Sequence, residues 1–385
     1  MGCLIKSTLL GVLLAMAAGL AAENVLAGGT AMRRTDTPQL PQQMHDYLSV
    51  LPPHLYSLEK IDNTPASNPL TNAGATLGRV LFHDHQLSRN GLVACASCHT
   101  QTTGFDDSTR LSIGFAGKIT RRSAMALANA RYNPAGRYFR DERAATLEEQ
   151  VLDPFTDAIE MGLQPGELVS AVAARSFYPP LFAAAFGNSD ISEPRIAAAL
   201  AQYVRAIVST HSPYDAGRAG VSDPRQDFVS FSASENHGKR LFLLPREQGG
   251  AGCAACHATE AFVLLEPKNN GLETKTRTVD DGIGETTKNP SDLGKFRTAS
   301  LRNIAATAPY MHDGRFATLA AVIEHYASNV QPHPNLSVEL KAKNGEPARL
   351  DFKPCDKQAL VDFLTALTDA QLLADPRFGD PFVAR

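Results

Sequence analysis

The chain has 385 residues, which is enough for two domains that each bury a hydrophobic core. Its formal net charge is −3 and its sequence pI is about 6.4, so neither nucleic acid nor an anionic membrane surface is an expected partner. Hydrophobic residues make up 43% of the chain, as in an ordinary globular protein, and the absence of Trp excludes a redox role for that side chain.

Residues 1–27 are predicted to be a secretory signal peptide. Lys6 is the only charged residue before Glu23, and residues 9–22 form an apolar run that small residues follow. The alternative is a membrane anchor, but this run is short for a span of about 20 residues. We therefore expect a periplasmic protein with no stable membrane insertion after signal removal.

The rest of the chain divides into a lead-in and two predicted domains. Residues 28–69 are rich in Pro, Thr and Asn, which predicts an extended lead-in. Residues 213–233 contain a polar stretch that is the expected linker. The N-terminal domain would then cover residues 70–212 and the C-terminal domain residues 234–385.

Helical patterns dominate both predicted domains. Residues 146–149 form a capping box that predicts a helix start, and apolar residues recur at helical spacing over residues 196–207. Further helices are expected from Thr318 and over about residues 356–367. Because strand-like alternation is scarce, we predict a mainly α fold with long loops.

Two Cys-x-x-Cys-His units carry the strongest chemical signal of the sequence, and they contain four of the six cysteines. This pattern is typical of c-type haem attachment, in which two thiols bond to the haem vinyl groups and the histidine is the proximal iron ligand. We therefore predict two covalently bound haem c groups in two cytochrome c-like domains, although no repeat beyond these units is evident. The predicted attachment residues are Cys95, Cys98 and His99 for the first haem and Cys253, Cys256 and His257 for the second.

The second axial position of each iron decides whether a haem carries electrons or binds a substrate. After His99 the next histidine is His211, so the first haem has no nearby histidine to close it. Met125 and Met161 remain alternative ligands. The sequence therefore favours an open first haem that can bind hydrogen peroxide.

Over most of the predicted mature chain the sequence resembles the bacterial di-haem cytochrome c peroxidase and MauG family. The resemblance implies a peroxidatic first domain and an electron-transfer second domain. It also implies that Gln150, Pro154 and Glu160 line the peroxide pocket of the first haem, where Glu160 would move protons. The matching segments are residues 81–99, 141–150, 160–162, 253–257 and 296–314.

The same resemblance implies a calcium ion between the domains. Thr307 and Pro309 correspond to residues that contribute backbone carbonyls to that ion. The asparagine ligand of the family corresponds to Ser123 here.

Two departures from the classical peroxidases concern the axial ligands. Phe115 stands where those enzymes have a histidine that caps the first haem, and Tyr326 stands where they have a methionine at the second haem. MauG proteins have a tyrosine there, so the resemblance implies Tyr326 as the distal ligand of the second iron. We expect Tyr326 to face inward with Leu319, Val322 and Ile323 while His325 points elsewhere, and Met311 is the alternative ligand.

A third departure lies between the haems. Family members commonly carry a tryptophan in this region, and Arg140 replaces it here. Electrons would then pass by Tyr138 or by direct tunnelling, and the specific MauG reaction, which also draws on a surface tryptophan, is disfavoured.

These features predict an oxidoreductase of the cytochrome c peroxidase type. Its substrate would be hydrogen peroxide, and its electron donor a small redox protein such as cytochrome c or a cupredoxin. The alternative is a MauG-like enzyme that uses peroxide to oxidise residues of a partner protein. A pure electron-transfer cytochrome is disfavoured by the open first haem.

Overall fold

The computed structural model describes residues 34–48, 50–272 and 280–383, so the predicted signal peptide lies outside the described residues. Over these residues the chain is helical and contains isolated β-bridges but no strand, which confirms the predicted mainly α class. The helices of the first half are α1 (Asn72–His83), α2 (Cys95–Cys98), α3 (Leu147–Gln150), α4 (Asp153–Thr156), α5 (Glu167–Ala173), α6 (Tyr178–Phe186) and α7 (Glu193–Ala206). Those of the second half are α8 (Pro213–Arg218), α9 (Ala233–Leu243), α10 (Gly284–Thr287), α11 (Leu319–Glu324), α12 (Pro354–Thr365) and α13 (Ala370–Ala374).

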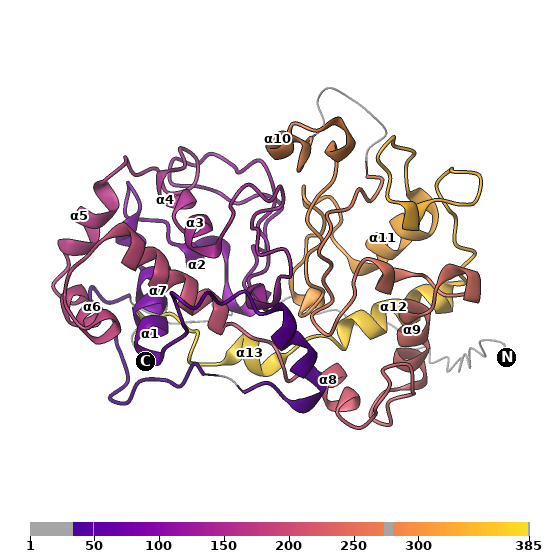
Figure 1. The fold of residues 1–385 in the computed structure, drawn as a ribbon, viewed down its shortest axis with the longest axis horizontal. Helices are drawn as coiled ribbons and strands as arrows, with labels where there is room; N and C mark the ends of the chain where they lie inside the picture. Colours follow the sequence, from indigo (N-terminus) through magenta and orange to yellow (C-terminus); the bar gives the residue numbers. More distant parts are fainter. Residues whose placement is uncertain (1–33, 49, 273–279, 384–385) are drawn as a thin grey trace, which may run out of the picture.

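Figure 1 shows the two halves side by side, with α1 to α7 on one side and α9 to α12 on the other. Each half is built on one pair of closely packed helices, α1 against α7 and α9 against α12. A Cβ atom on Gly78 would lie 2.0 Å from the carbonyl oxygen of Ala199, and one on Gly238 would lie 1.8 Å from that of Ala359. Glycine therefore permits the backbones of both helix pairs to approach closely.

A second contact occurs at equivalent positions of both halves. Asn129 and Asn303 both adopt a left-handed backbone conformation, each with φ of 63°. The amide of Asn129 donates to the carbonyl of Ile207 at the end of α7, and that of Asn303 donates to Leu367 just after α12. A structural repeat therefore extends well beyond the two Cys-x-x-Cys-His units, although the sequence shows no evident repeat outside them.

Three segments differ from the expected domain outline. Within the lead-in, residues Pro53–Ile61 form a 3₁₀ helix whose Leu55 and Leu58 are buried. The stretch expected to be a linker contains α8, and Tyr214 of that helix belongs to the core of the second half. At the C-terminus, the chain returns to the first half, because Phe378 and Phe382 pack in its core.

Among the described residues, no single helix is both long and apolar enough to cross a membrane. Taken together, α5 and α6 have the length and apolar composition of a membrane span, but the two helices are bent by 104° at their junction.

The close approach of α1 to α7 gives a test of the fold. We expect Gly78→Ala to lower the free energy of unfolding by ~1–3 kcal/mol, because the added methyl group meets rigid backbone of Ala199. Gly220→Ala is the control, since the nearest atom to its added Cβ would be 3.5 Å away. Urea denaturation of the haem-loaded protein measures both, and equal stabilities would contradict the packing described.

Candidate functional site

The first Cys-x-x-Cys-His unit begins with the single turn α2, which Ser97 stabilises by accepting a hydrogen bond from the amide of Ala94 at 3.0 Å. His99 follows directly. Its Nδ1 lies 2.9 Å from the carbonyl oxygen of Phe105, which fixes the ring and leaves Nε2 available to a metal. Such a bond is the usual support of a histidine ligand.

The second unit repeats this arrangement. Nδ1 of His257 lies 3.2 Å from the carbonyl oxygen of Phe262. Both supporting phenylalanines have positive φ angles, 61° for Phe105 and 54° for Phe262, which turn their carbonyls toward the histidines. Sequence reasoning missed these residues, because a phenylalanine shortly after each haem unit does not by itself indicate a positive φ.

A cavity of about 430 Å³ adjoins the first unit and is lined by Cys98 and His99. Gln150, Pro154 and Glu160 line the same cavity, so the structure brings together all three residues expected at the peroxide pocket. They come from the end of α3, from α4 and from the turn that follows α4.

The turn that carries Glu160 is held by Asp157. Oδ1 of Asp157 accepts hydrogen bonds from the amides of Ile159 at 2.7 Å and Glu160 at 3.0 Å. Burial, together with the nearby Asp157 charge, raises the pKa of Glu160 to about 7, while Arg143 acts in the opposite direction. Glu160 can therefore both accept and return a proton near neutral pH.

Phe115 does not line this cavity, because its ring packs against Gly162, where a Cβ would lie 2.2 Å from the ring. The two methionines considered as alternative ligands are both close by. Met125 lines the larger cavity, whereas Met161 is buried and lines a smaller adjoining cavity with Cys95.

The cavity contains cations that suit an anionic cofactor. Arg140 and Arg297 line it, and no carboxylate of the described residues accepts a hydrogen bond from either. Nε of Arg297 is buried without a hydrogen-bond partner, and burial lowers the pKa of Arg140 to about 10. Since a buried cation without an anion is costly, the carboxylates of a haem fit this cavity.

The second half places Tyr326 close to Cys253 and Cys256. It does not share a face with Leu319 and Ile323 as expected, because α11 ends at Glu324 and a π-helical turn follows over His325–Asn329. Tyr326 packs instead beside a separate cluster formed by the buried side chains of Val330, Leu336 and Leu340.

Tyr326 is partly buried, and burial raises its pKa to about 12. The side chain of Asn270 hydrogen-bonds to it and also lies 3.4 Å from Sδ of the alternative ligand, Met311. His325 points elsewhere, with its Nε2 2.9 Å from the carbonyl of Asn270. Asn270 therefore connects both candidate ligands, and sequence reasoning did not identify it as a site residue.

The internal repeat relates Tyr326 to the first pocket. Thr146 caps α3 by accepting from the amide of Glu149, and Thr318 caps α11 by accepting from that of Ala321. Pro154 lies eight positions after the first cap, and Tyr326 lies eight positions after the second. Tyr326 thus occupies the position that lines the cavity opposite His99 in the first half.

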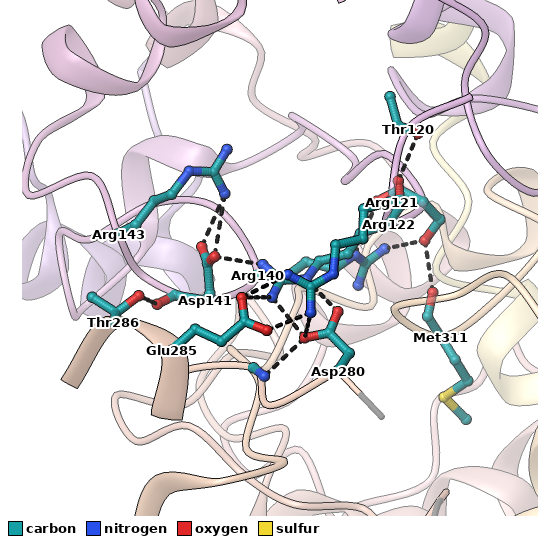
Figure 2. Close-up of polar contacts among 12 residues, drawn as sticks. Thr120, Arg121, Arg122, Arg140, Asp141, Arg143, Asp280, Glu285, Thr286 and Met311 are labelled. Atoms are coloured by element: carbon teal, nitrogen blue, oxygen red, sulfur yellow. Dashed lines mark hydrogen bonds and ion pairs between the residues drawn. The ribbon is translucent and has the colours of Figure 1, made fainter. Parts of the chain in front are cut away.

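The halves meet through a reciprocal pair of main-chain bonds. The amide of Ser123 donates to the carbonyl of His312, and the amide of Arg297 donates to the carbonyl of Arg140, each at 2.9 Å. Figure 2 shows the side chains around this junction, where Arg122 pairs with Asp280 at 2.6 Å.

The hydrogen bonds of the described residues do not connect the residues that are expected at a calcium ion. Thr307 is buried and donates to the carbonyl of Ile304 at 3.1 Å, and Pro309 is half-buried. No described hydrogen bond joins either of them to Ser123, which donates through its hydroxyl to the Met311 carbonyl at 2.7 Å.

The sequence and the fold of this chain are similar to those of known proteins. Residues 72–223 match the family described as di-haem cytochrome c peroxidase. The methylamine utilization protein MauG of Methylophilus methylotrophus is 34% identical over 84% of this chain and 90% of its own length. The cytochrome c551 peroxidase of Nitrosomonas europaea is 31% identical over 69% of this chain and 76% of its own length. A crystal structure of a MauG-like protein associated with microbial copper homeostasis has a TM-score of 0.73 and 33% identity, covering 86% of this chain and 98% of that one.

The first pocket yields a spectroscopic prediction. Phe115 cannot ligate iron, so we expect one high-spin and one low-spin haem in the ferric protein as isolated. Electron paramagnetic resonance and electronic spectra measure this directly. Two low-spin centres would mean that a side chain such as Met125 or Met161 closes the first site.

Proposed function

The chain belongs to the di-haem cytochrome c peroxidase and MauG family, and from this premise we propose that it is a periplasmic di-haem c-type peroxidase. As a member of this family it is an oxidoreductase that uses two haems. In our proposal both haems are covalently attached. Hydrogen peroxide is reduced at the first haem, with electrons delivered through the second haem from a small redox protein such as cytochrome c or a cupredoxin.

The observation that carries this proposal is the convergence of Gln150, Pro154 and Glu160 on the cavity that His99 lines. A haem bound at His99 would supply the redox chemistry that cleaves the peroxide O–O bond. Glu160 takes the proton from one peroxide oxygen and returns it to the other, which leaves as water. The amide of Gln150 is placed to orient the bound peroxide, and Pro154 adds an apolar wall without a competing ligand atom.

The experiment that tests the proposal is steady-state turnover. The haem-loaded protein is mixed with hydrogen peroxide and either reduced cytochrome c or a reduced cupredoxin, and oxidation of the donor is followed by absorbance. Peroxide-dependent oxidation of a donor supports the peroxidase. Failure with both donors would contradict it.

A second candidate function is oxidative maturation of a partner protein, and Tyr326 is the observation that favours it, because the resemblance gives MauG proteins a tyrosine at this position. Arg140 disfavours it, since no indole lies between the haem sites. Mass spectrometry of an exported partner protein, after incubation with the enzyme and peroxide, distinguishes the two. New oxygen insertion or cross-linking in the partner would favour maturation.

Glu160 gives the first mutational prediction. Glu160→Gln keeps the shape of the side chain but removes its proton exchange, so peroxide cleavage should slow by roughly 100- to 10,000-fold while both haems stay bound. Stopped-flow mixing with peroxide measures the rate. Glu167→Gln, the same change at an exposed residue that pairs with Arg89, should leave the rate unaltered. An unchanged rate in Glu160→Gln would remove this residue from the mechanism.

Tyr326 gives the second mutational prediction. If its phenolate is the distal ligand of the second iron, Tyr326→Phe should convert the second haem to high spin. Tyr326→Met should keep it low-spin and raise its reduction potential, because a thioether favours the ferrous state. Tyr310→Phe removes a hydroxyl elsewhere in the same half and serves as the control. A second haem whose spin state and potential are unchanged in Tyr326→Phe would transfer the assignment to Met311 or His325.

A further inference from the structure

The guanidinium of Arg140 is bound to a cluster of oxygen atoms at the junction of the halves. Its Nε donates to the carbonyl of Ser123 at 3.1 Å, and its Nη2 donates to Oγ of Ser123 at 2.8 Å and to the carbonyl of Ala124 at 2.7 Å. The hydroxyl of Ser123 in turn donates to the carbonyl of Met311 at 2.7 Å. One cation therefore organises the oxygen atoms through which the first half contacts the second.

This cation differs from its neighbour in the same network. Arg122 forms ion pairs with Asp141, Asp280 and Glu285, as Figure 2 shows. Arg140 has only neutral oxygens as hydrogen-bond partners among the described residues. Asp106 and Asp313 favour its charge through space, but neither accepts a hydrogen bond from it.

The family resemblance implies a calcium ion with Ser123 among its ligands, and the geometry does not fit that ion. Calcium binds oxygen ligands at about 2.3–2.6 Å, so an ion on Ser123 Oγ would lie within about 5 Å of the guanidinium nitrogen that already contacts this oxygen. Two cations at this separation repel each other strongly in a partly buried site. Ser123, Thr307 and Pro309 bring no carboxylate of their own to offset that repulsion, and the charges of Asp106 and Asp313 already act on Arg140.

We propose that the Arg140 guanidinium is itself the resident cation of the junction, and that this protein needs no calcium ion between its halves. A guanidinium is always protonated, and its donors point to several oxygen atoms at once, as a divalent ion does. The side chain that displaces the interhaem tryptophan thereby replaces the ion as well. This inference concerns the junction and does not depend on which oxidation the enzyme performs.

The first experiment uses the haem-loaded wild-type protein. After dialysis against a calcium chelator and then against metal-free buffer, elemental analysis should find no stoichiometric calcium. Its melting temperature and the spin states of both haems should be the same in chelator and in millimolar calcium, because a ligand that does not bind the native state cannot stabilise it. One retained equivalent of calcium, or a melting temperature that falls in chelator, would overturn the proposal.

The second experiment tests the charge itself. Arg140→Met should lower the melting temperature of the haem-loaded protein, and Arg140→Lys, which keeps a cation, should lower it less. Arg121→Met is the control, because this neighbouring arginine is exposed and pairs with Glu285 at the edge of the same network. Equal stability of Arg140→Met and Arg121→Met would overturn the proposal, as would equal losses in the methionine and lysine variants. If Arg140→Met does not accumulate in folded form whereas Arg140→Lys does, the result supports the proposal, because only the variant that keeps a cation folds.

Discussion

Two equivalent main-chain hydrogen bonds connect the halves that carry the two Cys-x-x-Cys-His units. Ser123 donates to the carbonyl of His312, and Arg297 donates to that of Arg140. The internal repeat relates the two donors, because Ser123 and Arg297 each lie six positions before the left-handed asparagines, Asn129 and Asn303. It also relates the two acceptors, because each lies six positions before the threonine that caps α11 or α3. Since these bonds use backbone atoms alone, they do not themselves require a particular side chain at position 140.

The choice of side chain at position 140 matters because this position lies both beside the first haem cavity and at the junction of the halves. An indole there could lose an electron and share oxidising equivalents between haems, whereas a guanidinium cannot. Arg140 instead adds positive charge beside the cavity, where Arg297 contributes a second cation. Positive charge stabilises the reduced form of a nearby redox centre. This charge at the junction is the reason for which we propose peroxide reduction rather than long-range oxidation of a partner protein.

Residue types and their spacing predicted the two haem units, whereas only the family resemblance implied the convergence of Gln150, Pro154 and Glu160 on one cavity. The sequence did not reveal the internal repeat, because 24 positions separate His99 from Ser123 whereas 40 separate His257 from Arg297. It also misjudged the face of Tyr326, since helical periodicity assumes regular turns and cannot anticipate the π-helical turn after Glu324. The carbonyls that orient the histidines escaped notice because a positive φ at a phenylalanine has no reliable sequence signal.

The repeat also shows how one scaffold could provide the one open and one closed site of the proposed enzyme. In each half a threonine caps a short helix. In the first half the chain then lines the cavity that His99 also lines. Four positions after the cap lies Gln150 in the first half and Val322 in the second; eight positions after it lie Pro154 and Tyr326. Proline offers iron no ligand atom and leaves space beside a polar amide, whereas tyrosine offers a phenol beside an apolar side chain. In the proposed enzyme, substrate access and ligand closure would therefore arise at equivalent positions of the backbone, and peroxide would react in the half that also carries Glu160.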